Sequence, residues 1–265
     1  MTAALYASGS GPTPRHSRAR RWLRRLAWLM LAFIVVTWLP VLILRFVPPL
    51  TSAYMVEREL SQAWHGNHAF TIHYDWVPWK HIAPVASLAM VAGEDQTFPF
   101  NHGFDIASIK SAIAEADEGG RLRGASTITQ QTARNLFLWS GGGFFRKGLE
   151  AYFTVLIDIT WPKRRVLEVY ANIAELGDGI YGVEAASQAY WHEPASHLTS
   201  HQAALLAAVL PNPRGWHADR PSAYIQRRAA WIEQQMRQLG GVGYVLDEHP
   251  PKPRVDEPQR RDRKR

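Results

Sequence analysis

An uncharged run of 19 residues near the N-terminus, Leu26–Leu44, is the feature that most constrains the fold of this chain. As an α-helix it would be about 28 Å long, close to the hydrocarbon thickness of a bilayer. A signal peptide has a shorter apolar stretch followed by small residues, whereas this run continues into LRFV at residues 44–47. A buried core helix is rarely apolar on all sides and preceded by arginines. The sequence therefore predicts one transmembrane signal-anchor over residues 26–47.

The charges on either side of this run predict its orientation. Residues 1–25 contain six arginines and no acidic residue. By the positive-inside rule, this basic tail stays in the cytoplasm and the chain beyond residue 47 lies on the outer side of the membrane. The absence of cysteine suits an oxidising exterior.

The net charge of +7 suggests nucleic acid binding at first sight, but the excess lies in the two tails. Residues 246–265 contain seven basic and five acidic residues, and the N-terminal tail supplies most of the remainder. The body between the tails is close to neutral. A near-neutral body does not predict a basic groove for a phosphate polymer, so we expect no nucleic acid partner.

After a connector at residues 48–75, helical patterns follow one another to about residue 242. No run alternates with the period of a strand, so a mainly α domain is expected over residues 76–242. Asp105 and Thr199 stand at predicted N-caps, and Gly240 at a predicted C-cap. Residues 243–265 are predicted to be a disordered charged tail. The predicted helices cover residues 54–64, 84–93, 106–118, 127–138, 144–160, 162–172, 199–210 and 222–239.

Glu94 and Asp95 are paired acids at the end of an apolar helix, at the start of the segment EDQTFPFNHGFD. A carboxylate at a helix C-terminus faces the negative end of the helix dipole, which raises its pKa. Such a group is suited to accept a proton near neutral pH. The alternative is a pair of solvated acids at a helix end.

The segment GASTITQQTARNLFL, Gly124–Leu138, concentrates polar residues at the start of another helix. A helix N-terminus offers free backbone amides and hydroxyls to an anion such as phosphate, and Arg134 could reach the same anion from one to two turns further on. A plain N-cap followed by an amphipathic helix is the alternative. The candidate binding residues here are Ser126, Thr127, Gln130, Gln131 and Arg134.

Arg146 and Lys147 precede Glu150 on one helical face. They could form a surface ion pair of little consequence, or a leaving-group site in which the cations stabilise a departing diphosphate and Glu150 orients or assists. The glycine-punctuated segment Lys163–Trp191 is interpreted mainly as packing, with Glu168 and Asn172 as weaker candidates. The histidines lack metal-site spacing, so no zinc site is expected.

Taken in order, these segments resemble the glycosyltransferase family 51 domain, and specifically the monofunctional biosynthetic peptidoglycan transglycosylases. The resemblance covers about 140 residues, from Asp75 to Pro213, and ends in AALLAAVLPNP. The combination of GASTITQQ with R-K-x-x-E downstream is highly specific. No S-x-x-K or K-T-G motif accompanies it, so no penicillin-binding module is expected.

The resemblance implies a lysozyme-like, two-lobed helical fold with a membrane-dipping jaw in a bacterial cytoplasmic (inner) membrane. Lipid II would be the substrate, with the nascent glycan strand, the membrane and division or elongation proteins as partners. Glu94 would be the general base and Glu150 would assist departure of undecaprenyl diphosphate. No cofactor is required by the pattern, although a divalent cation, Mg or Mn, at the diphosphate is an alternative. The implied phosphate-binding residues are Ser126, Thr127, Gln130, Gln131, Arg134, Arg146 and Lys147.

One position departs from the family pattern E-D-x-x-F-x-x-H-x-G, because this chain has Asn101 where that pattern has histidine. His102 is the neighbouring residue. The departure puts an indispensable role of that imidazole in doubt for this chain.

Synthesis from an α-linked diphosphate donor to a β-1,4 product requires inversion. By analogy with inverting glycosidases, we expect Glu94 and Glu150 to face each other across a cleft at about 6.5–9.5 Å or somewhat more. Two alternatives are a lytic transglycosylase, which would have no diphosphate to bind, and an inactive membrane scaffold of the cell-wall machinery.

Overall fold

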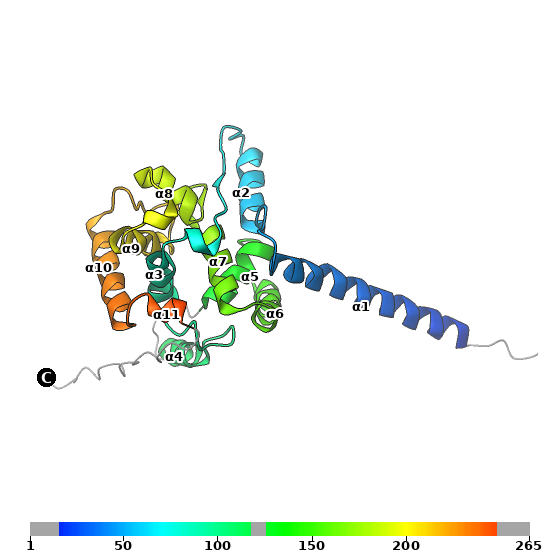
Figure 1. The fold of residues 1–265 in the computed structure, drawn as a ribbon. Coiled ribbons are helices and arrows are strands. Elements are labelled where there is room, and N and C mark those ends of the chain that lie inside the picture. Colours follow the sequence, from blue (N-terminus) through cyan, green and yellow to red (C-terminus); the bar gives the residue numbers. More distant parts are fainter. Residues whose placement is uncertain (1–15, 118–125, 248–265) are drawn as a thin grey trace, which may run out of the picture. The chain divides into compact units, whose positions relative to one another are not determined.

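The computed structural model describes residues 16–117 and 126–247, in two compact units that divide after Ile43. Most described residues are helical (Figure 1), which confirms the predicted mainly α fold with one apolar helix at its N-terminus.

The first unit consists of most of helix α1, His16–Leu44. Within the described residues, Arg20–Leu44 is the one helix that is long and apolar enough to cross a membrane. Its large apolar side chains are largely exposed; Trp28, for example, is 70% exposed. A surface rich in exposed apolar side chains is what a membrane-spanning helix presents to lipid. A single membrane anchor follows from this helix, whereas its orientation stays a prediction. Residues 1–15 of the basic tail lie outside the described residues.

The second unit contains ten α-helices among its described residues, with three short strands. The strands are β1 (His73–Tyr74), β2 (Glu175–Gly177) and β3 (Ile180–Tyr181), in the order β1-β3-β2. β1 pairs parallel to β3, and β2 pairs antiparallel to it. Two single 3-10 turns, η1 (Trp79–His81) and η2 (Ala195–His197), complete the unit. The helices are α2 (Ala53–Trp64), α3 (Pro84–Glu94), α4 (Ile106–Asp117), α5 (Ile128–Phe137), α6 (Phe144–Thr160), α7 (Lys163–Ile173), α8 (Val183–Trp191), α9 (Ser200–Val209), α10 (Ala223–Gln238) and α11 (Gly243–Leu246).

Helix α3 lies in the core, packed against α9 and α10 (Figure 1). Every residue from Ala86 to Ala92 is buried, because alanine, serine and glycine let neighbouring helices approach closely. The contact with α10 is tight at Gly93, where a Cβ atom would stand 3.3 Å from Ile232 Cδ1. This packing fixes the position of Glu94, the last residue of α3, relative to α9 and α10.

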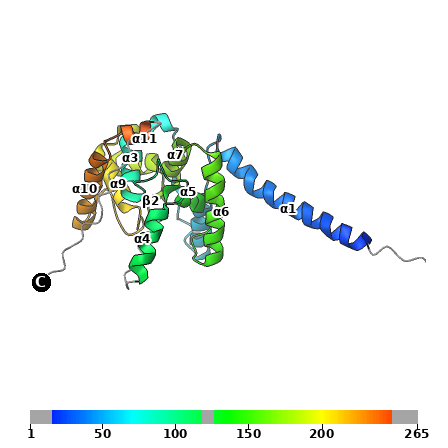
Figure 2. The ribbon, with the colours of Figure 1, turned by 90° about the horizontal axis from the view of Figure 1, so that it is seen from below.

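Helices α5 and α6 lie side by side (Figures 1 and 2), with Phe137 and Phe153 stacked at 4.6 Å between ring centroids. Helix α2 covers α5 on another side, and Glu57 of α2 accepts hydrogen bonds from the backbone N and the Oγ of Ser140, both at 2.6 Å. The loop between α5 and α6 is therefore tied to α2.

The predicted caps are confirmed. Asp105 Oδ1 accepts from Ser108 N at 2.9 Å, Thr199 forms a capping box with Gln202, and Gly240 ends α10 with a φ of +93°. The prediction of disorder from residue 243 is wrong at its start, since Gly243–Leu246 forms α11. Tyr244 explains the difference: its ring is buried and its hydroxyl donates to Gln96 O at 2.6 Å. Glu118, the predicted end of α4, and residues 248–265 lie outside the described residues.

Candidate active site

Glu94 is the last residue of α3, and its carboxylate is held between two other helices. Gln131 Nε2 of α5 donates to Glu94 Oε2 at 3.0 Å, and Arg228 of α10 lies 3.6 Å from Glu94 Oε1. The Glu94 side chain is 17% exposed, so it is accessible at one edge only. A carboxylate with few water contacts and fixed neighbours is preorganised for proton transfer.

Burial raises the pKa of Glu94 above its ordinary value, which agrees with the predicted direction. The hydrogen bond from Gln131 and the charges of Arg228 and Arg134 oppose the rise, while the charge of Asp95 adds to it. Sequence reasoning attributed the rise to the helix dipole, whereas desolvation is the largest cause in the structure. Desolvation outweighs the opposing contacts, so the carboxylate takes up a proton more readily than an exposed glutamate does.

Gln131 connects Glu94 to the core. Its Oε1 accepts from the hydroxyl of Tyr170 at 3.0 Å, and its Nε2 donates to Glu94. Tyr170 is fully buried, and burial raises its pKa well above the ordinary value, so the hydroxyl stays a donor. This donor fixes the amide orientation that directs an N–H toward Glu94. Gln131, predicted as a phosphate ligand, therefore lies against the carboxylate.

The start of α5 differs from the expected anion site. Thr127 and Gln130 form a reciprocal capping box, in which Thr127 Oγ1 accepts from Gln130 N at 3.1 Å and Gln130 Oε1 accepts from Thr127 N at 2.9 Å. Asp95 Oδ2 accepts from Ile128 N at 3.0 Å. The prediction of free amides is wrong for these positions, because side chains of the protein already occupy them. Ser126 lies just before the cap and is half-buried.

Glu150 lies within α6 with its side chain 1% exposed. Arg146 Nη1 donates to Glu150 Oε2 at 2.7 Å, and Lys147 Nζ donates to Glu150 Oε1. The pattern R-K-x-x-E is thus an ion triad built on one face of a helix. Because each carboxylate oxygen is occupied by a cation, Glu150 orients these two side chains.

Arg134 of α5 stacks over the ring of Tyr54, with its guanidinium carbon 5.7 Å from the ring centroid. The buried Nε atoms of Arg134 and Arg146 have no hydrogen-bond partner within the described part of the chain. Burial raises the pKa of Tyr54, while the charges of Arg134 and Arg146 lower it, which places both arginines around the same phenol. Arg134 of α5 and Arg146 of α6 therefore both lie near Tyr54 of α2.

The two weaker candidates, Glu168 and Asn172, bind the backbone around the start of η1. Glu168 Oε1 accepts from Trp79 N at 2.7 Å, and Asn172 exchanges two hydrogen bonds of 2.9 Å with the backbone of Val77. Both side chains hold the segment that leads into η1, which agrees with the interpretation of this region as packing. Gly182 passes so close to Asn172 that a Cβ would stand 2.3 Å from its carbonyl oxygen.

Sequence reasoning missed three neighbours of the site, namely Arg228, Tyr170 and Tyr54. A signal existed for Arg228: it lies between Ile225 and Ile232 on the buried face of α10, at helical spacing. A charged residue in such a stripe has to meet a partner. The two tyrosines have no comparable signal, since aromatic residues are common in cores.

Among residues 16–117 and 126–247, no group of three His, Asp or Glu side chains is arranged to hold a metal ion. The Glu150 oxygens are both engaged by cations. These residues do not fit a resident divalent ion.

The site therefore combines a largely buried carboxylate with a raised pKa, Glu94, and a nearby set of arginine and lysine side chains. A family model described as transglycosylase matches residues 64–237. The biosynthetic peptidoglycan transglycosylase of Stutzerimonas stutzeri (strain A1501) is 51% identical over 226 residues, which are 85% of this chain and 93% of that protein. The protein of the same description from Xanthomonas axonopodis pv. citri (strain 306) is 50% identical over 228 residues, 86% of this chain and 93% of the relative. This chain belongs to the transglycosylase family.

Proposed function

We propose that this peptidoglycan glycosyltransferase polymerises lipid II into linear β-1,4 glycan strands by an inverting mechanism, with release of undecaprenyl diphosphate. The single observation that best supports the mechanism is the environment of Glu94. Its carboxylate is largely buried, its pKa is raised, and Gln131 and Arg228 hold it in place.

Glu94 removes the proton of the acceptor 4-hydroxyl. The oxygen of that hydroxyl forms the new bond to the anomeric carbon of the donor, on the face opposite the diphosphate. The bond between that carbon and the diphosphate oxygen breaks, and its electron pair leaves with the diphosphate. Gln131 supports the reaction by keeping Glu94 oriented through its contact with Tyr170.

Arg134, Arg146 and Lys147 bind the diphosphate and stabilise the charge that develops as it departs. The Nε atoms of Arg134 and Arg146, unpaired among the described residues, support this assignment, because a buried guanidinium N–H without an acceptor is costly unless a ligand supplies one. Glu150 keeps Arg146 and Lys147 in position between turnovers. The capping box of Thr127 and Gln130 holds the start of α5, and Ser126 lies at its entrance.

A divalent cation, Mg or Mn, would have to arrive with the diphosphate, because the described side chains do not form a site for it. No step of the mechanism is assigned to it. Activity that persists after chelation with EDTA would support a reaction run by the protein cations alone.

The apolar surface of the second unit supports contact with the membrane. Val56, Leu60 and Trp64 lie on one face of α2 along an open groove of about 600 Å³, and Trp64 is 88% exposed. Phe144 and Phe145 are exposed at the start of α6, in the region that Glu57 ties to α2. We propose that this surface rests in the outer leaflet, with residues 1–25 in the cytoplasm. Division or elongation proteins are further proposed partners, and no nucleic acid is expected.

The test is polymerisation of fluorescent lipid II by detergent-solubilised protein, with Glu94→Gln as the variant and Glu59→Gln as a matched control. Glu59 is exposed on α2. Lysozyme-sensitive polymer from the wild type and the control, and none from Glu94→Gln, would support both the reaction and the base. Polymer from Glu94→Gln at the wild-type rate would eliminate Glu94 as the base.

A further inference from the structure

We propose that Asn101 is a positioning residue for the active site, and that its side-chain amide holds Asp95 at the junction of α3 and α5 without dependence on pH. This inference rests on the proposed role of Glu94. It concerns the contacts that hold the start of α5 against the end of α3.

The amide of Asn101 uses both its donor and its acceptor. Nδ2 donates to the two oxygens of Asp95 at 2.9 and 3.0 Å, and Oδ1 accepts from Lys163 Nζ at 3.1 Å. Lys163 also donates to the backbone oxygen of Asn101 at 2.5 Å. Asn101 is 8% exposed and Asp95 is 6% exposed, so water does not replace these contacts easily.

Asp95 connects Asn101 to the start of α5. The Asp95 carboxylate, which accepts from Asn101 Nδ2, also accepts from Ile128 N at the first residue of α5, at 3.0 Å. One helical turn later, α5 places Gln131 against Glu94. Asn101 thus acts on the base through Asp95 and α5, without touching substrate itself.

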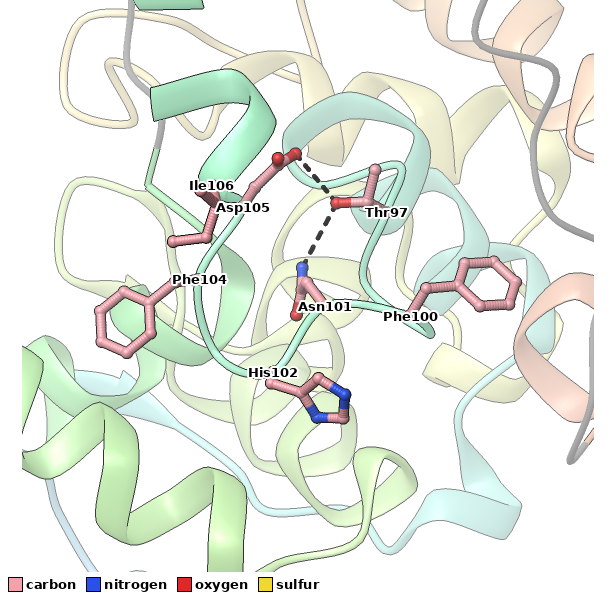
Figure 3. A pocket seen from close by; sticks show the side chains of 7 residues that line it. All are labelled: Thr97, Phe100, Asn101, His102, Phe104, Asp105 and Ile106. Carbon is pink, nitrogen blue, oxygen red and sulfur yellow. Dashed lines mark hydrogen bonds between the residues drawn. The ribbon is translucent and has the colours of Figure 1, made fainter. Parts of the chain in front are cut away.

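The neighbouring imidazole does not take this place. The side chain of His102 is 95% exposed, and its Nδ1 lies 3.8 Å from Asp158 Oδ2. Figure 3 shows His102 pointing away from Asn101, whose amide is directed toward Thr97 beside a pocket of about 360 Å³. The exposed imidazole of His102 therefore takes no part in the contacts between Asn101 and Asp95.

Asparagine, histidine and aspartate at position 101 offer hydrogen-bond donors and acceptors that depend differently on pH, and this difference distinguishes the proposal from a packing role. An amide offers N–H donors and a carbonyl acceptor at every pH. An imidazole offers both only when neutral, because the imidazolium has two donors and no acceptor for Lys163. A carboxyl offers both only when protonated; once ionised, it repels Asp95. Replacement by histidine should therefore fail at low pH, and replacement by aspartate should fail at high pH.

Several charged groups surround Asn101 and affect these titrations. Thr97 bridges to Asp105 at the start of α4 at 3.0 Å, and Lys163 of α7 also contacts Asp158 of α6 at 3.2 Å. Tyr244 of α11 lies near enough for the charge of Asp95 to raise its pKa. All of these groups are shared by the wild type and the variants, so ratios of activity isolate position 101.

The experiment measures lipid II polymerisation between about pH 5.5 and 8.5 for wild type, Asn101→His, Asn101→Asp and Asn101→Ala, with His102→Ala as the control. Relative to wild type, Asn101→His should lose activity progressively below about pH 6.5. Asn101→Asp should lose activity as the pH rises. Asn101→Ala should lower kcat by about 10- to 100-fold at every pH with little change in KM, because the substrate contacts remain. His102→Ala should match wild type.

The proposal is overturned if Asn101→His and Asn101→Asp follow the wild-type profile, or if His102→Ala alone abolishes activity. Far-UV circular dichroism and thermal unfolding check that each variant is folded, and the opposite pH trends of two variants cannot arise from a common folding defect. Glu94→Gln is measured in parallel. If Glu94→Gln stays active, the proposed base fails, while the trends at position 101 still report on positioning.

Discussion

The hydrogen bond from Gln131 to Glu94 leads to a quantitative expectation for Gln131→Ala. The bond joins a neutral donor to a carboxylate at 3.0 Å, and it is one of the contacts that restrain the rise in the pKa of Glu94. A hydrogen bond to a charged group contributes about 1.5–3 kcal/mol, and one pKa unit corresponds to about 1.4 kcal/mol. Its removal should therefore move the acid limb of the kcat/KM profile upward by about one to two pH units.

The sign follows from the role of the base. Glu94 has to be ionised to accept a proton, so a higher pKa removes active enzyme at low pH and leaves activity at high pH unchanged. At pH values below the wild-type acid limb, kcat/KM of Gln131→Ala should fall by about 10- to 100-fold, with recovery toward wild type above the shifted limb. Steady-state polymerisation of fluorescent lipid II across the pH range provides the measurement.

Tyr170→Phe is the matched control, because it removes the hydroxyl that orients Gln131 while the amide can still donate to Glu94. Its acid limb should move less than that of Gln131→Ala. An acid limb that stays in place in Gln131→Ala would refute the assignment of that limb to Glu94, and with it the positioning role of Gln131.

Three further predictions concern stability. The pKa of Glu94 is raised in the folded state, so the stabilisation present below the unfolded pKa is lost as the pH rises through the folded pKa. Glu94→Gln should therefore raise Tm at pH 8, by about 2–4 °C per kcal/mol, and change it little at pH 4. Arg146→Ala should cost about 3 kcal/mol, because it leaves the buried Glu150 with one cation fewer, whereas Lys147→Ala should cost less since that lysine is 49% exposed. Ser222 is the N-cap of α10, and its Oγ accepts from Ile225 N. Ser222→Ala should therefore lower the free energy of unfolding by about 1 kcal/mol, measured by calorimetry. Equal Tm losses for the Arg146 and Lys147 variants would contradict the inferred difference in burial.

The helices were predictable wherever local signals define them. Helix α6 begins after three glycines and ends before Trp161-Pro162, so its predicted range of 144–160 is confirmed at both ends. Helix α3 extends one residue beyond its predicted end at Gly93, because Glu94 still has helical geometry. Such boundaries depend on residues adjacent in sequence, which is the information that a sequence pattern contains.

The contacts of the site were less predictable, because they join distant elements. Arg228 reaches Glu94 only because α10 packs against α3, and no local pattern specifies that pairing. The expected free amides of α5 are occupied because Asp95, 33 residues earlier, accepts from Ile128 N. The structure brings predicted site residues together in two groups, Gln131 with Glu94, and Arg146 and Lys147 with Glu150. Their roles and the spacing of the two carboxylates stay predictions.

The close approach of α3 and α10 at Gly93 has an evolutionary consequence. Ile232, which limits that approach, lies one helical turn beyond Arg228, and Gly93 directly precedes Glu94. A larger side chain at position 93 would push the two backbones apart and lengthen the ion pair beside the base. Mutations that only exchange one apolar residue for another in this interface would therefore alter the pH optimum as well as the melting temperature. In directed evolution for thermostability, substitutions in the interface of α3 and α10 should therefore change the melting temperature and the turnover number together.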